Sequence, residues 1–434
     1  MNFQLLHPRD QLVAVMNRIY HSGMTTLSGG NLSILDDNGD IWITPAGVDK
    51  GRLTPQDIMC VADDGRIIGD GRITGRHRPS TELPFHRAIY TARPDLRAIV
   101  HAHPPALVSF SLARQVPDMR ALPAAWRICG AVGYAPYALT GSEQLGRHIA
   151  ATFGAGFNSV MLENHGAVTG GETLLDAFQR LEMLEFAARA LLRAAALGPI
   201  HSLTDEQIAF QAEQPEALPE FAPAGHSSHE RELRQQLADA VHRAYDRQLM
   251  VSSQGAASVR VDETRFLITP TGGDRRSLAI DDLVLVADGR RETGKFPSRA
   301  ARLHQAIYAA QPDVQCIIQA QPPHATAFAI GDGRFDTRTI PESYILLRGI
   351  PTFPFARHYY APEELATAVS FHAPVALLAN EGLLVVGKHI LQAFDRLEVA
   401  EFSARSLLDT AALGPLVPIG EDELRELEAA FNLT

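Results

Sequence analysis

The sequence predicts two tandem α/β domains, each built on a sheet that helices cover on both faces. One observation is an internal repeat: AFQRLEMLEFAARALLRAAALGP at 177–199 returns as AFDRLEVAEFSARSLLDTAALGP at 393–415. The other is that, within each copy, short apolar stretches that suit strands alternate with stretches of helical apolar spacing. The length of 434 residues is sufficient for two hydrophobic cores.

Further matched segments fall in the same order in both copies. WITPAG at 42–47 corresponds to LITPTG at 267–272, and PSTELPFHRAIYTARPD at 79–95 corresponds to PSRAARLHQAIYAAQPD at 297–313. The repeat therefore extends over nearly the whole chain.

The segment between the copies is rich in Pro, Ala, Ser and Glu and has no apolar periodicity, which is typical of a linker. We expect a first domain at 1–210, a linker at 211–230 and a second domain at 231–434.

The first elements of copy one follow from local pattern. Apolar residues at helical spacing predict a helix over 9–22, which the glycine-rich SGGN ends. GDIWITPAG at 39–47 predicts a strand that stops at a Pro/Gly turn. A helix is expected over 80–95, with Ser80 as its N-terminal cap.

The remaining elements of copy one carry the polar motifs. RAIVHAHPP at 97–105 predicts a short buried strand closed by two prolines, and SVMLENHGAVTGG at 159–171 predicts a strand, a turn and a second strand. A long amphipathic helix is expected over 173–196.

Composition excludes several classes of function. The net charge is -11 and no Lys/Arg cluster with interleaved aromatics occurs, which argues against nucleic acid. No apolar run reaches the roughly 18 residues of a membrane span, and the first residues lack signal-peptide character, so a cytoplasmic protein is expected. Three cysteines without paired spacing suggest neither disulfides nor a thiolate metal site. With nucleic acid and membranes excluded, we expect the partner to be a small molecule or a protein.

Three histidines in copy one change together in copy two. His101 and His103 lie at alternate positions of one predicted strand, so both side chains face the same way and can hold one metal ion. His165 lies in the turn ENHGA, which a strand end could bring to the same place. Taken singly, such residues are more often polar strand edges or solvated turn residues. Their counterparts in copy two are Gln319, Gln321 and Glu381, which indicates a functional unit that copy two has lost.

The motifs GGNLS, TPAG, PSTE, HAHPP and ENHGA, in this order, resemble the class II aldolase/adducin family. The resemblance covers about residues 9–200 with every motif and about 235–415 with degenerate ones. It implies three-layer α/β/α domains, each with a mainly antiparallel or mixed central sheet. Members include fuculose and rhamnulose phosphate aldolases, ribulose-phosphate 4-epimerase, several decarboxylases and the non-enzymatic head of adducin.

The resemblance implies that His101, His103 and His165 bind one divalent metal ion per chain, usually zinc, with Mn, Co or Fe as alternatives. It also implies that Glu82 is the catalytic acid/base, with a second implied role of closing the coordination sphere in the empty site. An alternative is that Glu82 is a helix N-terminal carboxylate favoured by the helix dipole. Ala300 occupies the matching position of the metal-free copy, which favours catalysis.

A set of small residues matches the positions that form an anion pocket in the family's sugar-phosphate enzymes. The alternative is that these motifs are tight turns, since copy two retains TPTG. The neighbouring Arg76 and Arg78 could assist an anion or could be solvated surface charges. The implied anion or substrate residues are Asn31, Thr44, Gly47, Ser80 and Thr81.

The resemblance implies a lyase that cleaves a carbon–carbon bond in a small hydroxy-keto substrate, with or without a phosphate group, through a metal-stabilised enediolate. A metal-dependent decarboxylase of a hydroxy or aromatic acid is the alternative, and a non-catalytic adducin-like binding protein is a second one. An epimerase would use the same residues.

We expect copy two to be a degenerate domain that serves structure. The family usually forms fourfold rings with active sites between subunits, so a homo-oligomer is expected in which two tandem chains imitate the ring. Copy two would then supply a wall to a copy-one site, although aromatic residues in such a stretch are more often packing. The candidates for that wall are Arg348, His358, Tyr359 and Tyr360.

Overall fold

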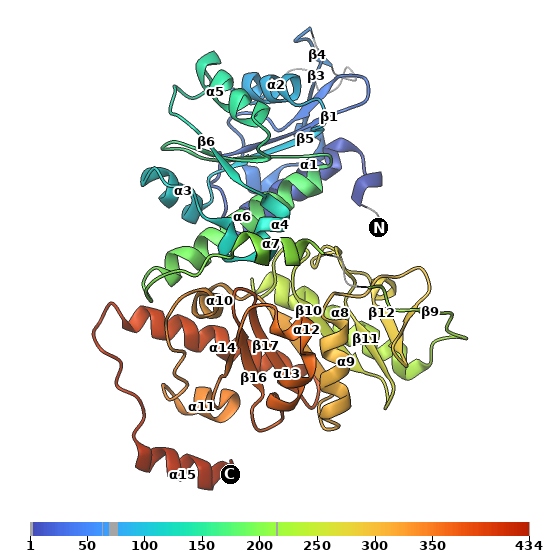
Figure 1. Ribbon diagram of the computed structural model, residues 1–434. Coiled ribbons are helices and arrows are strands. Elements are labelled where there is room, and N and C mark those ends of the chain that lie inside the picture. Colours follow the sequence, from blue (N-terminus) through green and yellow to red (C-terminus); the bar gives the residue numbers. More distant parts are fainter. Residues whose placement is uncertain (1–2, 63, 69–76, 214–215, 434) are drawn as a thin grey trace. The chain divides into compact units, whose positions relative to one another are not determined.

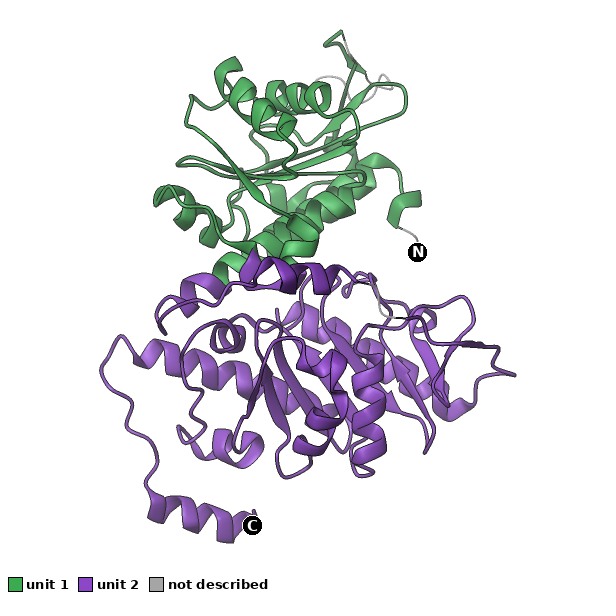
Figure 2. Ribbon diagram, in the orientation of Figure 1, with its two compact units in different colours: residues 1–119, 125–189 green, residues 120–124, 190–434 purple. Residues whose placement is uncertain are grey.

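The computed structural model describes residues 3–62, 64–68, 77–213 and 216–433. Its contacts divide the chain into two compact units (Figure 2). Unit 1 comprises residues 1–119 and 125–189, and unit 2 comprises residues 120–124 and 190–434.

The contact boundary differs from the boundary of the repeat. The helix α7 (Asp205–Ala212) belongs to unit 2, although the repeat assigns it to copy one. The predicted linker contains the short strand β9 (Glu220–Phe221) and the start of α8 (Ser228–Asp246), while residues 214–215 lie outside the described part. The composition of this segment did not predict the strand and the helix start, because they are stabilised by packing on the rest of unit 2.

Unit 1 contains a mainly antiparallel sheet (Figure 1). Its order among the described residues is β4-β3-β2-β1-β5-β8-β7-β6, and only β6 and β7 run parallel. The strands are β1 (Asn31–Leu35), β2 (Ile41–Ile43), β3 (Met59–Val61), β4 (Ile67–Ile68), β5 (Ala98–Ala102), β6 (Val132–Ala135), β7 (Ser159–Leu162) and β8 (Gly166–Gly171).

Helices cover both faces of this sheet. Phe85 and Ile89 of α2 and Ile149 and Phe153 of α5 pack against the strands in one core, and α1 and α6 lie on the opposite face (Figure 1). Unit 1 therefore has the predicted three-layer α/β/α arrangement. The helices are α1 (Pro8–His21), α2 (Leu83–Ala92), α3 (Pro105–Leu112), α4 (Pro123–Cys129), α5 (Glu143–Gly154) and α6 (Leu174–Ala194).

The expectation that Ser80 caps a helix is wrong. Helix α2 begins at Leu83, with Glu82 at the N-cap and a proline in its first two positions. The preceding residues form a turn instead, in which Leu83 N donates to Ser80 O at 3.1 Å and the Ser80 hydroxyl accepts from Glu82 N at 3.3 Å. This turn leaves the Glu82 side chain buried.

Unit 2 repeats the sheet with the same strand order. Reading from β15, the order is β15-β16-β17-β14-β10-β11-β12-β13-β9, with β9 as an added edge strand. Among the strands of the described residues of unit 2, only the pairs β15–β16 and β9–β13 are parallel. The strands are β10 (Ala256–Arg260), β11 (Arg265–Ile268), β12 (Val284–Ala287), β13 (Arg290–Glu292), β14 (Cys316–Ala320), β15 (Thr352–Phe353), β16 (Val375–Leu378) and β17 (Gly382–Gly387).

The helices of unit 2 contribute to two hydrophobic cores. Apolar side chains of α9 and α13 pack with one face of the sheet, and apolar side chains of α8, α10, α11 and α14 pack with the other. Among the described residues, no helix combines the length and apolar character needed to span a membrane. The further helices are α9 (Ala301–Ala310), α10 (Pro323–Ile330), α11 (Pro341–Leu347), α12 (Arg357–Tyr360), α13 (Pro362–Ala368), α14 (Ile390–Thr410) and α15 (Glu421–Phe431).

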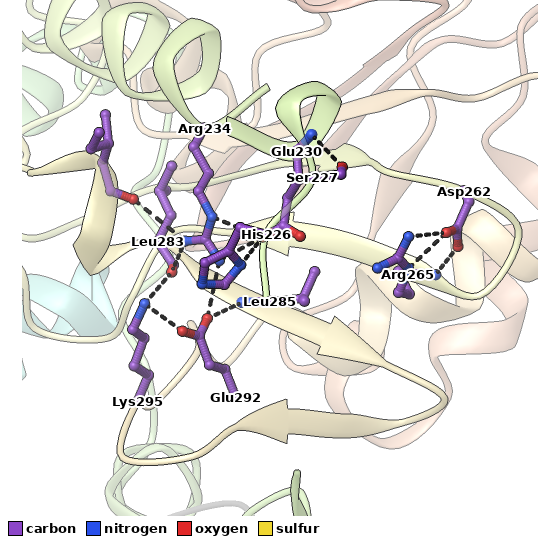
Figure 3. Close-up of polar contacts among 11 residues, drawn as sticks. His226, Ser227, Glu230, Arg234, Asp262, Arg265, Leu283, Leu285, Glu292 and Lys295 are labelled. Atoms are coloured by element: carbon purple, nitrogen blue, oxygen red, sulfur yellow. Dashed lines mark hydrogen bonds and ion pairs between the residues drawn. The ribbon is translucent and has the colours of Figure 1, made fainter. Parts of the chain in front are cut away.

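A buried ionic cluster joins α8 to strands β12 and β13 in unit 2 (Figure 3). The Arg234 guanidinium contacts Glu230 at 2.9 Å and Glu292 at 3.1 Å, and it donates to Leu283 O at 2.7 Å. Lys295 lies 2.8 Å from the second oxygen of Glu292. Arg234 is 3% exposed and Glu230 is fully buried, so each carboxylate depends on its cationic partner for solvation.

We predict that Arg234→Met lowers the free energy of unfolding by about 3–5 kcal/mol, because it removes the buried cation that Glu230 and Glu292 share. The exposed pair Arg405–Asp409 on α14 has the same i,i+4 spacing. Arg405→Met should change the free energy by less than about 0.5 kcal/mol. Urea unfolding followed by circular dichroism measures both variants, and equal effects would contradict the importance of burial.

Candidate metal centre

Strand β5 and the β7–β8 turn bring three histidines together. His101 lies in β5, where it pairs with Asn31 of β1 on one side and Val168 of β8 on the other, and it is fully buried. His103 follows the end of the same strand, and His165 follows Asn164 in the turn. Asn164 has a left-handed φ of 54°, a conformation that asparagine tolerates, so the turn presents His165 toward β5.

Two glycines allow the backbone to approach these histidines. A Cβ atom on Gly30, which has a φ of +71°, would lie 2.7 Å from the carbonyl oxygen of His101. A Cβ atom on Gly166 would lie 2.5 Å from the carbonyl oxygen of Ala102. Both distances are too short for any side chain, which explains physically why GGN and NHG contain glycine.

The arrangement of the imidazoles fits a metal ion. Ligand nitrogens of His101, His103 and His165 lie within 4.8 Å of one another, and the Nε2 atoms of His101 and His103 are 3.1 Å apart. Two nitrogens bound to tetrahedral zinc at about 2.0–2.1 Å would be separated by about 3.3 Å. His101 Nδ1 lies 3.0 Å from Ala167 O, so a proton on Nδ1 leaves the Nε2 lone pair for a ligand bond.

Electrostatics keep the cluster neutral. Burial lowers the pKa of His101 well below its usual value, and the neighbouring His103 and His165 lower it further. Burial, followed by the repulsion from His165, lowers the pKa of His103 to about 4. Burial also lowers the pKa of His165, although Glu82 opposes this shift. Neutral imidazoles are the form that binds metal, so the site needs no deprotonation near neutral pH.

Glu82 lies beside the histidines. Its Oε2 is 3.3 Å from His101 Nε2, and its Oε1 is 3.8 Å from His165 Nε2. Oε1 is buried and has no hydrogen-bond partner among the described residues. One carboxylate oxygen is thus available to a proton or a ligand at the cluster.

Asn31 binds the other oxygen of this carboxylate. Its Nδ2 donates to Glu82 Oε2 at 2.7 Å, and its Oδ1 lies 2.6 Å from His86 Nε2. The Asn31 side chain is therefore fully engaged inside the site. His86 was not among the residues expected from the sequence, although a signal was present: His86 and its counterpart His304 are retained in LPFHRAIY and ARLHQAIY.

The residues expected to bind an anion lie at two adjoining turns. Pro45 and Pro79 form a β-bridge, which brings TPAG next to PST. Thr44 is buried and its hydroxyl accepts from Leu32 N at 3.1 Å, while Gly47 has a left-handed φ of +66°. Ser80 is buried at the turn before α2, Thr81 and Arg78 are exposed, and Arg76 lies outside the described residues.

Lys50, a buried cation next to the TPAG turn, was also not among the residues expected from the sequence. Lys50 is 1% exposed and its Nζ donates to Pro45 O at 2.5 Å. Burial lowers the pKa of its ammonium group to about 8. In unit 2, Arg275 donates in the same way to Pro270 O at 3.2 Å, so a cation holds this turn in both copies.

In unit 2, the chain's own side chains occupy the corresponding position. Glu381, which replaces His165, accepts hydrogen bonds from Gln211 Nε2 at 2.7 Å and Tyr359 OH at 3.1 Å. His358 Nε2 lies 2.9 Å from the same carboxylate. The buried Oε1 atoms of Gln319 and Gln321 have no hydrogen-bond partner among the described residues.

The four residues expected to form a wall are all placed within unit 2. His358 is 2% exposed and, like Tyr359, contacts Glu381. Tyr360 is 59% exposed, and the Arg348 guanidinium donates to Leu433 O at 3.3 Å. Two of the four, His358 and Tyr359, thus contact the carboxylate of Glu381, which stands at the position of His165.

Comparison with known proteins gives the same family for both copies. The family model described as "Class II Aldolase and Adducin N-terminal domain" matches residues 10–192 and 235–408. The chain is 31% identical over 205 residues to a 5-deoxy-D-ribulose 1-phosphate aldolase from Bacillus thuringiensis serovar kurstaki, covering 46% of this chain and 91% of the relative.

Two further relatives complete the comparison. A 3-oxo-tetronate 4-phosphate decarboxylase from Escherichia coli K12 is 31% identical over 208 residues, covering 46% of this chain and 93% of the relative. The solved structure of L-fuculose 1-phosphate aldolase from Glaciozyma antarctica PI12 is 26% identical with a TM-score of 0.41, covering 47% of this chain and 79% of that one.

Proposed function

The chain belongs to the class II aldolase and adducin family, and on this premise we propose that it is a metal-dependent lyase that cleaves a carbon–carbon bond in a small, phosphorylated hydroxy-keto substrate. The observation that carries the proposal is the cluster of His101, His103 and His165 with Glu82 beside it. Three imidazoles leave a position open for substrate, as catalytic metal sites do.

His101, His103 and His165 would hold the ion, and zinc is the metal we propose because neutral imidazole nitrogens suit it. When bound, such an ion supplies Lewis-acid polarisation of a substrate carbonyl. Glu82 supplies the acid/base: its Oε1 moves the proton, while Asn31 holds Oε2 at 2.7 Å. The carboxylate is buried, so bulk water does not compete for that proton.

The substrate class rests on the turns at Thr44–Gly47 and Ser80–Thr81. These turns adjoin through the Pro45–Pro79 bridge and the Ala46 N to Arg78 O hydrogen bond of 2.9 Å. Glycine-rich turns and a helix N-terminus offer backbone N–H donors to a phosphate or carboxylate. The names of both curated relatives described above specify phosphorylated substrates, which supports a phosphate here.

A decarboxylase is the second candidate, and the relative that acts on 3-oxo-tetronate 4-phosphate favours it. Loss of carbon dioxide and aldol cleavage both leave electron density next to a carbonyl, so the same residues serve either reaction. The products separate the two: a panel of ketose phosphates and phosphorylated 3-oxo acids should release an aldehyde in the first case and carbon dioxide in the second.

We predict that the protein, purified and supplemented with zinc, carries about one divalent ion per chain. His101→Ala should lose the ion, because two imidazoles bind it more weakly, whereas Gln319→Ala at the matching position of unit 2 should retain it. Elemental analysis measures the content, and circular dichroism verifies the fold. A metal-free protein, or binding indifferent to His101, would leave the non-catalytic, adducin-like role.

We predict that Glu82→Gln lowers kcat by about 10²–10⁴-fold, because the amide cannot exchange the proton. The metal content should remain that of the parent protein if the histidines are the ligands. Steady-state assays on the substrate panel measure the effect, with the exposed Glu172→Gln as control. A Glu82→Gln enzyme with full kcat would remove the acid/base role.

We also propose that two or more chains associate. Three apolar side chains within five residues after α14 are exposed in the single chain: Leu413 is 90%, Leu416 37% and Val417 85% exposed. A group of exposed apolar side chains in one segment suits an interface. Light scattering should give a multiple of the 47.2 kDa chain mass, and Leu413→Asp with Val417→Asp should reduce it. A parent mass of one chain would contradict the proposal.

A further inference from the structure

We propose that His86 is a positioning residue that fixes the orientation of the Glu82 carboxylate through Asn31, at the end of a buried hydrogen-bonded relay. The relay runs from Tyr90 through Ser33 to His86, then to Asn31 and Glu82. The role assigned to His86 rests on the proposed acid/base function of Glu82, whereas the relay itself can be tested without any activity.

Every link of the relay is short and buried. Tyr90 OH lies 2.7 Å from Ser33 Oγ, and Ser33 Oγ lies 2.6 Å from His86 Nδ1. His86 Nε2 lies 2.6 Å from Asn31 Oδ1, and Asn31 Nδ2 lies 2.7 Å from Glu82 Oε2. Ser33 and His86 are fully buried. Water therefore cannot replace either partner of these hydrogen bonds at little cost.

The ionised carboxylate sets the direction of each hydrogen bond. It only accepts, so the Asn31 amide must direct Nδ2 to Glu82 and Oδ1 to His86. Oδ1 also accepts, so His86 must carry its proton on Nε2. His86 Nδ1 is then an acceptor for the Ser33 hydroxyl, and Ser33 Oγ accepts from the Tyr90 hydroxyl. One arrangement of protons satisfies the whole relay.

The environment keeps both ends of the relay in the required forms. Burial lowers the pKa of His86 to about 3, so the ring is neutral and has a single N–H to place. Burial raises the pKa of Tyr90 far above its usual value, so the phenol retains the proton that it donates. The aromatic ring of Phe85 stacks on the His86 ring, with 4.5 Å between the ring centroids, and further restricts the imidazole.

Unit 2 contains the Tyr–Ser–His part of the relay but not the asparagine and the glutamate. Tyr308 OH lies 2.8 Å from Ser258 Oγ, which lies 2.8 Å from His304 Nδ1, and His304 is fully buried. Ala256 and Ala300 replace the asparagine and the glutamate. The Nε2 atom of His304 is consequently buried with no hydrogen-bond partner among the described residues.

This difference separates a packing role from a positioning role. If Tyr, Ser and His served only the fold, both units would show the same environment at Nε2. Instead, the donor finds an acceptor only in unit 1, where that acceptor leads to the carboxylate beside the histidines. The relay ties Oε2 and leaves Oε1 3.8 Å from His165 Nε2.

The first experiment reads the relay directly in the metal-free full-length protein. Nitrogen-15 NMR of histidine-labelled protein should show His86 as the neutral Nε2–H tautomer at pH 7. Asn31→Ala and Glu82→Ala should each shift the His86 Nε2 signal and speed exchange of its proton, while the His304 signal stays unchanged. An Nδ1–H tautomer, or a His86 signal indifferent to Glu82→Ala, would overturn the relay.

The second experiment separates positioning from stability by a matched pair. His86→Ala should lower kcat by roughly 10–100-fold with KM and metal content unchanged, because the carboxylate loses its fixed orientation. His304→Ala removes an equally buried ring with the same Ser and Tyr contacts, and kcat should remain that of the parent. His86→Gln, whose amide can donate to Asn31, should recover part of kcat.

Equal losses in the two alanine variants, or a loss confined to KM, would assign His86 to packing. Ser33→Ala is a second variant if His86→Ala fails to fold, and it should lower kcat in the same direction. If the parent protein cleaves no member of the substrate panel, the proposed function fails, and the NMR measurement still decides whether Glu82, Asn31 and His86 are coupled.

Discussion

The register between β1 and β5 is the constraint on which the site depends. Asn31 lies opposite His101 across this antiparallel pair, with Gly30 giving the backbone room to approach. A slip of one residue would turn His101 to the other face of the sheet and separate it from Asn31. Unit 2 keeps the identical register, with Ala256 opposite Gln319. The fold therefore persists without the three histidines, because the register depends on apolar packing and not on the proposed metal ligands.

The parts of the fold and site that depend on periodicity were predictable from the sequence. Alternation in AIVHAH placed His101 and His103 on one face, and the repeat predicted two copies of one sheet. What local pattern could not supply was long-range pairing. Nothing near Asn31 in the sequence indicates that its amide binds Glu82, because the two residues are 51 positions apart. Likewise, the start of α2 at Leu83 depends on a turn held by Ser80, and the place of α7 depends on packing against unit 2.

Unit 2 lacks the three histidines, and its Glu381 needs partners of its own. A carboxylate at the position of His165 is buried, and a buried charge is costly unless it is hydrogen-bonded. Glu381 receives two hydrogen bonds, from Gln211 and Tyr359, and Arg299 NH1 donates in turn to Gln211 Oε1 at 2.9 Å. At the position of His165, unit 2 thus carries a carboxylate that its own side chains satisfy, which is consistent with the structural role expected of this copy.

The two oxygens of Glu82 have different surroundings, and this difference suits the proton transfer that we propose for the carboxylate. A carboxylate paired with a cation would be oriented but would also lose basicity, because the cation favours the charged form. Asn31 is neutral, and so is the His86 ring that directs it. A neutral donor on Oε2 fixes the orientation without placing a cation on the carboxylate, and Oε1 has no hydrogen-bond partner among the described residues. The buried relay behind Asn31 therefore holds Oε2 in place and leaves Oε1 for the proposed proton transfer.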